Sequence, residues 1–315
     1  MENSTVRQVE LSVIIPVSER YDPVSELFYE YKKGIEASGR SYEIVYVLDG
    51  NYPQVLEELT RLKETEQLTI IQLAKWFGEA TALTAAFSNT SGELILTLPA
   101  YQQIEANEIP KLIEGLTQSD MVLARRWPRR DSFFNRLQSK SFNFLLKSVS
   151  DLKIRDAGCG ARAFNRRIVE EVQIYGDLHR FFPIMAHRQG FRVIEIDVEQ
   201  SPRDTFRRIY APGLYVRRLL DLLTIFFLAK FTKKPLRFFG LVGTSLSGVG
   251  IAITLLIMAQ RLWFDVALAN RPALFLSSLL IVLGIQIIAI GLIGEIIIFT
   301  HARELKEYKI DKIIN

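Results

Sequence analysis

Cysteine is almost absent from this chain of 315 residues, since Cys159 is the only one. One cysteine excludes an internal disulfide framework and any zinc site built from several thiolates, and a small buried side chain is its simplest role. The first residues, MENSTVRQVELSV, also lack the apolar core of a signal peptide. We therefore expect the N-terminal part of the chain to stay in the cytoplasm.

Long apolar runs are missing from the first 198 residues but dominate the end of the chain. Residues 238–258 and 273–300 are each apolar enough and long enough to cross a membrane. Lys and Arg precede the first segment and follow the second, which places both outer ends in the cytoplasm. Glu295 lies inside the second segment, where the sequence leaves open a structural or a functional role.

These patterns predict an integral protein of the inner or plasma membrane. Its expected parts are a cytoplasmic domain over 1–200, a basic amphipathic juxtamembrane segment over 201–235, two transmembrane helices over 236–300 and a basic cytoplasmic tail over 301–315. The net charge of +4 gathers in two clusters of Lys and Arg, from 125 to 153 and from 203 to 234. Each cluster is either a solvated surface or a site for lipid phosphate. No recognised nucleic-acid motif accompanies the charge, so we expect no nucleic-acid partner.

Short apolar runs alternate with helical patterns through the first part of the chain. The runs at 11–17, 42–48, 69–73, 94–98, 121–124 and 192–198 predict strands. This alternation is typical of an α/β fold with a doubly wound, mostly parallel sheet. We expect amphipathic helices at 125–147 and 213–231 outside that sheet.

The segment after the predicted strand 94–98 has an unusual composition. Ligands in open α/β sheets bind at the carboxyl ends of strands, so Pro99 to Gln103 should border a site. No carboxylate follows the strand before Glu105. Mg²⁺ and Mn²⁺ prefer oxygen ligands, mostly carboxylates, and the pattern therefore predicts no metal here. The sequence leaves open whether Tyr101 fills this space or stacks on a base.

Several motifs occur along the chain in a fixed order. They are SVIIPV, YEIVYVLDG, KWFG from Lys75, EIP from Glu108, DAGCGAR from Asp156, HRFFP from His179, KPLRFFG from Lys234 and IGE ending at Glu295. In this order they resemble the polyprenyl-phosphate glycosyltransferases, membrane-anchored relatives of dolichyl-phosphate mannose synthase in glycosyltransferase family two. The resemblance covers nearly the whole chain.

The resemblance implies a GT-A-like head that transfers a sugar from a nucleotide-sugar to the phosphate of a membrane polyprenol. It further implies a homo-oligomer or a partnership with a related glycosyltransferase. The residues that stand at the family's functional positions, whether or not they match its residue types, fall into three groups. They are Asp156 and Gln103 as catalytic residues; Pro16, Glu19, Asp49, Lys75 and Tyr101 at the donor; and Arg125, Arg130, His179, Arg180, Arg203 and Arg207 at the lipid phosphate.

Three of these assignments have a structural alternative. Asp49 either contacts the nucleotide or caps its own loop. Asp156 either acts near the acceptor or caps its Gly-rich turn, and Arg162 is a possible pairing partner. His179 either lies near the acceptor phosphate or is packed in the core.

The chain departs from the family at the metal motif. Where the family has Asp-Ala-Asp-Leu-Gln, this chain has Pro99 and Tyr101 at the two acidic positions. The family's Asn-Glu is Glu19-Arg20 here, and its paired aspartates are Leu48-Asp49. Mg²⁺ or Mn²⁺ is usual in the family, but we predict no cofactor because the ligands are missing.

Two main functions follow from this pattern. The first is a transferase without the usual metal, in which Arg20, Lys75, Arg207 and Arg208 are candidates to stabilise the leaving diphosphate. The second is an inactive pseudo-transferase that binds lipid or a partner enzyme. An enzyme with a different donor is a third possibility. We do not expect a processive polysaccharide synthase, because Leu123 stands where the Gln-x-x-Arg-Trp pattern needs glutamine.

Overall fold

The computed structural model describes residues 9–18, 20–128, 152, 154–156, 158–172, 182–204, 235–264 and 272–301. The chain divides into two compact units, one formed by residues 1–222 with 308–315 and the other by residues 223–307. We refer to them as the head and the hairpin and describe each by itself. Most of the predicted amphipathic helix at 125–147, all of the one at 213–231 and the predicted tail from 302 onward lie outside the described residues.

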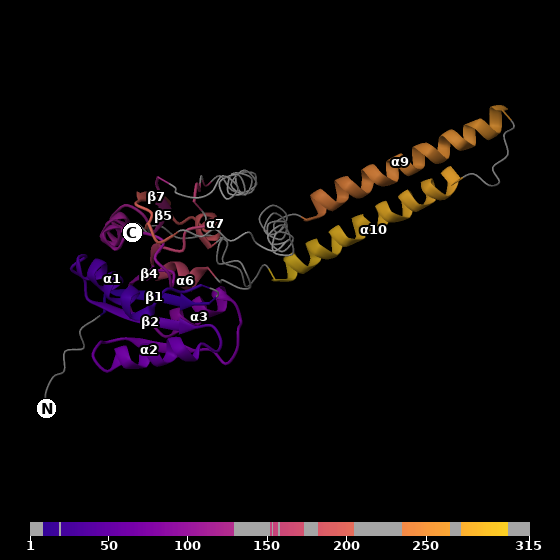
Figure 1. Ribbon diagram of the computed structural model, residues 1–315. Helices are drawn as coiled ribbons and strands as arrows, with labels where there is room; N and C mark the ends of the chain where they lie inside the picture. Colours follow the sequence, from indigo (N-terminus) through magenta and orange to yellow (C-terminus); the bar gives the residue numbers. More distant parts are fainter. Residues whose placement is uncertain are drawn as a thin grey trace. The chain divides into compact units, whose positions relative to one another are not determined.

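A seven-stranded sheet forms the centre of the head, with the order β3-β2-β1-β4-β6-β5-β7 (Figure 1). The strands are β1 (Leu11–Val17), β2 (Tyr42–Leu48), β3 (Thr69–Gln72), β4 (Leu94–Thr97), β5 (Met121–Arg126), β6 (Arg162–Asn165) and β7 (Val193–Val198). Strand β6 runs antiparallel to β4 and β5, and the other neighbouring strands pair in parallel. The predicted doubly wound, mostly parallel sheet is confirmed.

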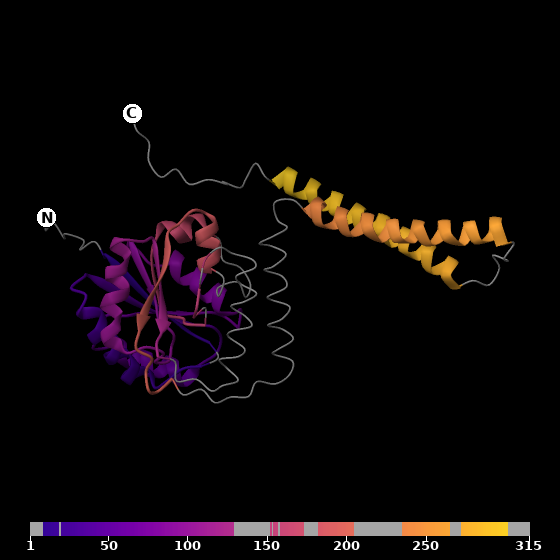
Figure 2. The same ribbon diagram turned by 90° about the horizontal axis from the view of Figure 1, so that it is seen from above.

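Helices lie on both faces of this sheet (Figure 2). They are α1 (Val24–Glu36), α2 (Pro53–Lys63), α3 (Glu79–Ser88), α4 (Ile109–Glu114), α6 (Arg167–Glu171) and α7 (Phe182–Arg188), with short 3-10 turns at Ala106–Glu108 and Gly115–Thr117. Helix α1 packs against α2 and α4. On the other face, Phe87 of α3 and Phe182 of α7 both contact the ring of Phe164 in β6.

Strand β6 was not predicted from the sequence. Its four residues are too few to show a periodicity, and it follows a glycine-rich turn that resembles a loop motif. Its place in the sheet comes from long-range pairing, in which Arg162 lies opposite Thr97 of β4. The strand therefore brings the turn at 156–160 beside the carboxyl end of β4.

The carboxyl ends of β1, β2 and β4 lie at one edge of the sheet. Val17 pairs with Leu48 in the β1–β2 register, and Ile14 pairs with Thr97 in the β1–β4 register. The loops that follow these three strands must therefore meet at that edge. Ligands of open α/β sheets bind at this edge, beyond the carboxyl ends of the strands.

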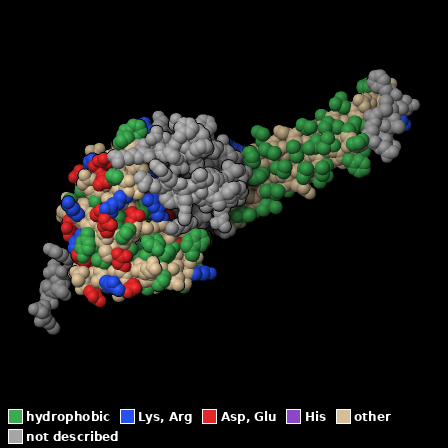
Figure 3. All heavy atoms as spheres, viewed as in Figure 1, with side chains coloured by type: hydrophobic (Ala, Val, Ile, Leu, Met, Phe, Trp, Pro, Cys, Tyr) green, Lys and Arg blue, Asp and Glu red, His purple; other side chains and the backbone are tan. Residues whose placement is uncertain are grey.

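The hairpin consists of α9 (Pro235–Phe264) and α10 (Pro272–His301), which pack side by side (Figure 1). Both are long and apolar enough to cross a membrane, and hydrophobic side chains cover them (Figure 3). Glycines allow the two backbones to approach closely, since a Cβ on Gly243 would lie 2.5 Å from the carbonyl oxygen of Gly284. Close contact between small residues is the usual way for transmembrane helices to associate.

Glu295 of α10 reaches the first turn of α9. Its Oε2 accepts a hydrogen bond of 3.3 Å from the backbone N–H of Leu236. The neighbouring Gly294 leaves room for this approach, because a Cβ there would lie 3.2 Å from Cγ of Pro235. The first N–H groups of a helix have no partner within the helix, so this carboxylate caps α9.

We expect Glu295→Ala to lower the stability of the hairpin by about 1–2 kcal/mol, because it leaves the N–H of Leu236 without this acceptor. Glu295→Gln keeps an acceptor oxygen at the same place and should retain most of the stability. Thermal unfolding of the full chain in detergent, followed by circular dichroism, measures both variants. Equal losses in the two variants would show that capping is not what Glu295 provides.

Candidate active site at the carboxyl edge of the sheet

The loop that follows β4 is held by hydrogen bonds from several directions. The hydroxyl of Tyr31 in α1 lies 3.0 Å from the carbonyl oxygens of both Pro99 and Tyr101. The backbone N–H of Asp22 donates to the carbonyl of Ala100 at 2.8 Å, and Asp22 Oδ2 accepts from the N–H of Gln102 at 2.9 Å. The loop is therefore braced against α1 and against the segment that follows β1.

Tyr101 packs beneath a guanidinium group within this loop. The Cζ atom of Arg20 lies 3.8 Å from the centroid of the Tyr101 ring. The phenol oxygen accepts a hydrogen bond of 2.5 Å from Nε2 of Gln103. Burial raises the pKa of Tyr101 to about 12, so the phenol is neutral at pH 7.

The residues at the end of β4 do not fit a divalent metal ion. Pro99 offers no side-chain ligand, the phenol of Tyr101 is neutral, and the amide oxygen of Gln103 accepts from the N–H of Gly160 at 2.8 Å. Mg²⁺ and Mn²⁺ need several oxygen ligands, usually with carboxylates among them. Across the part of the chain that the structure describes, no group of three or more His, Cys, Asp and Glu residues could hold a metal.

Four buried or half-buried charges connect the loop to the rest of the site, and we call Arg20, Arg126, Asp156 and Asp204 the charge network. Arg126 binds Asp156 in a bidentate manner, with Nε and Nη2 at 2.8 and 3.0 Å from the two carboxylate oxygens. Nη1 of Arg126 lies 2.7 Å from Oδ2 of Asp204. Oδ1 of Asp204 lies 3.2 Å from Nη1 of Arg20. The network thus includes the guanidinium that lies over the Tyr101 ring.

Arg126 is the centre of the charge network. Burial acts to lower the pKa of Arg126, but its hydrogen bonds and charge interaction with Asp156 outweigh that effect, and the net pKa is raised. The Asp156 carboxylate also accepts from the backbone N–H of Arg126 at 3.2 Å. Both carboxylate oxygens of Asp156 are therefore held by one residue, and a catalytic role for this side chain stays a prediction.

Asp49 holds a turn that comes from another part of the chain. Its two carboxylate oxygens accept hydrogen bonds from the backbone N–H groups of Phe77 at 2.8 Å and Gly78 at 3.0 Å. The side chain is fully buried, and Gly78 has the positive φ of 97° that glycine adopts readily. This turn precedes α3 and carries the exposed side chains of Lys75 and Trp76. Asp49 thus caps the KWFG turn and not its own loop. A contact with the nucleotide-sugar stays a prediction for Asp49 and Lys75.

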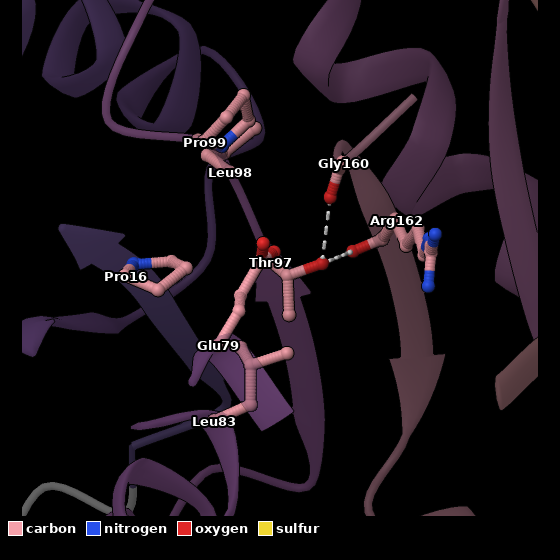
Figure 4. Close-up of a pocket in the computed structure, with 8 residues that line it drawn as sticks. All are labelled: Pro16, Glu79, Leu83, Thr97, Leu98, Pro99, Gly160 and Arg162. Atoms are coloured by element: carbon pink, nitrogen blue, oxygen red, sulfur yellow. Dashed lines mark hydrogen bonds between the residues drawn. The ribbon is translucent and has the colours of Figure 1, made fainter. Parts of the chain in front are cut away.

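A small pocket opens beside the end of β4 (Figure 4). Its lining residues are Pro16, Glu79, Leu83, Thr97, Leu98, Pro99, Gly160 and Arg162. The volume of about 20 Å³ has room for about one water molecule, so a nucleotide-sugar does not fit inside this pocket. Thr97 closes one side by donating from Oγ1 to the carbonyl of Gly160 at 3.0 Å.

Residues 12–173, which run through the strands β1 to β6 in chain order, match the family described as Glycosyl transferase family 2. The chain belongs to this family. Its resemblance to polyprenyl-phosphate glycosyltransferases, which the motifs indicated, is likewise supported by curated relatives.

Two curated relatives cover this family 2 chain almost from end to end. Both are named undecaprenyl-phosphate 4-deoxy-4-formamido-L-arabinose transferase. The protein of Proteus mirabilis (strain HI4320) is 30% identical over 311 residues, which are 96% of this chain and 94% of the relative. The protein of Klebsiella pneumoniae (strain 342) is 31% identical over 310 residues, which are 96% and 93%.

Solved structures support the GT-A glycosyltransferase fold of the head. The mannosyltransferase PcManGT of Pyrobaculum calidifontis, in complex with GDP-Man and Mn²⁺, has a TM-score of 0.50 and 19% identity over 70% of this chain and 64% of that chain. The chain thus matches just under two thirds of the length of that enzyme. Glucosyl-3-phosphoglycerate synthase of Mycobacterium tuberculosis has a TM-score of 0.52 and 10% identity over 69% of this chain and 78% of that chain. At these identities the likeness concerns the fold alone.

Two predicted lipid-phosphate residues of this family 2 chain pair with carboxylates on the head. Nη2 of Arg125 donates to Oδ2 of Asp197 at 3.0 Å. Arg203 lies 2.7 Å from Glu26 and 3.3 Å from Glu30 of α1. A role at the lipid stays a prediction for both arginines. The other predicted or candidate residues Glu19, Arg130, His179, Arg180, Arg207 and Arg208 lie outside the described residues.

Sequence reasoning missed Arg126 and Asp204 entirely. Alternation along β5 places Arg125 and Arg126 on opposite faces of the sheet, which signals that one of them is turned inward. Asp204 carries no comparable signal, because it lies 78 positions from its partner Arg126. Arg162, considered as a partner for Asp156, donates instead to the carbonyl oxygen of Cys159. Cys159 is buried, as predicted, and burial raises its pKa to about 11.

Proposed function

We propose that this protein transfers a sugar from a nucleotide-sugar to the phosphate of a membrane polyprenol, and that it does so without a divalent ion at the end of β4. One observation carries the proposal. The relatives named as undecaprenyl-phosphate transferases cover 96% of the chain, so they match the head and the hairpin together. A soluble transferase of the same fold would match the head alone.

The reaction makes simple chemical demands on the head. An oxygen of the acceptor phosphate attacks the anomeric carbon of the sugar, the bond from that carbon to the donor diphosphate breaks, and the nucleoside diphosphate leaves with the electron pair. The acceptor is already an anion, so no strong base is required. The main requirement is positive charge that stabilises the leaving diphosphate, which arginine side chains can provide in place of a metal.

The hairpin would hold the head at the surface where the lipid phosphate lies. We propose that α9 and α10 cross the membrane, with the head and the C-terminus in the cytoplasm, because Lys and Arg flank the outer ends of both spans. Assembly as a homo-oligomer or with a related glycosyltransferase is part of the same proposal. The alternative of an inactive pseudo-transferase gains no support from relatives that are named as transferases.

The proposal is tested with the purified full chain in detergent. We expect sugar transfer to undecaprenyl phosphate from at least one donor in a panel of UDP- and GDP-sugars, to a similar extent in EDTA and in Mg²⁺. Release of nucleoside diphosphate gives the rate, and mass spectrometry of the lipid identifies the product. A reaction mixture without undecaprenyl phosphate is the control. No glycolipid across the panel would contradict transfer, and glycolipid formed only with added metal would contradict the metal-independent form of the proposal.

A further inference from the structure

Arg20 occupies a special place at the carboxyl edge of the sheet. It follows β1, and its guanidinium lies 3.8 Å from the ring centroid of Tyr101, which follows the neighbouring strand β4. In the metal motif to which this loop corresponds, Tyr101 stands at the second acidic position. A fixed positive charge is therefore found where the family's motif would place the ligands of a metal ion.

The backbone on both sides of Arg20 is held by other loops of the site. The hydroxyl of Tyr52 donates to the carbonyl oxygen of Ser18, and the Tyr52 ring packs edge-to-face on Tyr21 at 5.8 Å between centroids. On the other side, Asp22 exchanges hydrogen bonds with the backbone of the loop that follows β4, at Ala100 and Gln102. The guanidinium is thus positioned before any ligand arrives, which saves the entropy of ordering a long side chain.

The charges of the network are arranged with the positive end outward. The side chains of Asp204, Asp156 and Arg126 are 4%, 1% and 8% exposed, whereas that of Arg20 is 25% exposed. The buried carboxylate of Asp204 bridges the two arginines, since Oδ1 faces Arg20 and Oδ2 faces Arg126. Asp204 therefore orients Arg20 through one carboxylate oxygen, while the more deeply buried Arg126 binds the other oxygen. Arg20 is therefore the most exposed member of the charge network.

From this geometry we infer that Arg20 binds the diphosphate of the sugar donor and takes over the charge stabilisation that a metal ion supplies elsewhere in the family. The inference rests on the proposed function for the identity of the donor. Asp204 and Tyr101 are positioning residues in this arrangement, because they act through Arg20. A guanidinium suits the task, since its planar N–H groups match two phosphate oxygens at once.

The test measures nucleotide binding to the full chain in detergent by calorimetry, with EDTA present. The probes are UDP, GDP and inorganic pyrophosphate, and uridine and guanosine serve as matching compounds without phosphate. For whichever diphosphate binds the unaltered chain, we expect Arg20→Gln to weaken binding by at least roughly tenfold, the size of one charge-assisted hydrogen bond. Binding of the corresponding nucleoside should be unchanged. Arg20→Lys keeps the positive charge but loses the planar pair of N–H donors. Its diphosphate affinity should lie between those of the unaltered chain and Arg20→Gln.

Controls separate a direct contact from a loss of fold. Arg61→Gln removes an exposed arginine of α2 that pairs with Glu57, and it should leave diphosphate binding unchanged. Thermal unfolding of Arg20→Gln shows whether the fold is intact. An unchanged affinity for the nucleoside shows that the rest of the nucleotide site is intact.

Several results would overturn the inference. They are diphosphate affinity in Arg20→Gln within about twofold of the unaltered chain, absence of binding to all three phosphate probes, and an equal weakening of nucleoside and diphosphate binding. The inference and the proposed function can fail separately. If diphosphate binding depends on Arg20 but no glycolipid forms with any donor, Arg20 keeps its role and the proposed transfer to lipid is wrong.

Discussion

Replacing Arg126 with methionine is expected to destabilise the head by about 3–5 kcal/mol, because it leaves two buried carboxylates without their shared partner. As whole residues, Asp156 and Asp204 are only 3% and 7% exposed, so bulk water solvates their carboxylates poorly. Methionine fills much of the volume of the arginine stem, which limits the loss from packing. Urea denaturation of the full chain in detergent, followed by tryptophan fluorescence, measures the change in free energy of unfolding.

The neighbouring residue offers a matched control for this prediction. Arg125 pairs with Asp197, whose side chain is 52% exposed, and Arg125→Met should cost no more than about 1 kcal/mol. The triple variant Arg126→Met, Asp156→Asn, Asp204→Asn removes the stranded charges and should recover part of the lost stability. Equal effects of Arg125→Met and Arg126→Met would show that the charge network does not stabilise the head.

The centre of the sheet could be predicted from the sequence with good accuracy. The predicted and observed bounds of β1 and β2 are the same, because strands buried on both faces form continuous apolar runs. Strand β6 was missed, since its pairing with β4 joins residues far apart in the sequence, such as Arg162 and Thr97, which are 65 positions apart. Local periodicity carries no information about such pairs.

The site shows the same division between local and long-range information. The absence of carboxylates at Pro99 and Tyr101 is visible in the sequence by comparison with the family's motif. The contact of Tyr101 with Arg20 cannot be seen in the sequence, because it joins the loops that follow two different strands. The same holds for the charge network, in which Asp204 meets Arg20 across 184 positions. A sequence can therefore show that a metal site is altered before it shows what stands in its place.

Asp49 illustrates how one local pattern can have two physical explanations. An aspartate before glycine at a strand end is typical of a turn and also of a ligand contact. In the structure both carboxylate oxygens hold the backbone of the KWFG turn, whose Trp76 and Phe77 are 57% and 47% exposed. The carboxylate thus fixes an aromatic surface at the edge where the donor is proposed to bind.

We expect Asp49→Ala to cost about 3 kcal/mol in the free energy of unfolding, because two hydrogen bonds to a buried carboxylate are lost together. The N–H of Gly78 is buried and would be left without this acceptor. Release of the turn should also weaken binding of UDP or GDP, whichever binds, by roughly tenfold or more. Calorimetry and urea denaturation of the full chain in detergent measure the two effects separately.

Two further variants decide between a structural and a direct role for Asp49. Asp49→Asn keeps one acceptor oxygen but turns an amide N–H₂ group toward a backbone N–H, so its loss of stability should be about half that of Asp49→Ala. Asn51→Ala changes an exposed side chain two positions away and should alter neither quantity. If Asp49 acts only through the turn, nucleotide affinity and stability fall in proportion across the series. A large loss of affinity in Asp49→Asn with stability retained would instead place the carboxylate in contact with the donor.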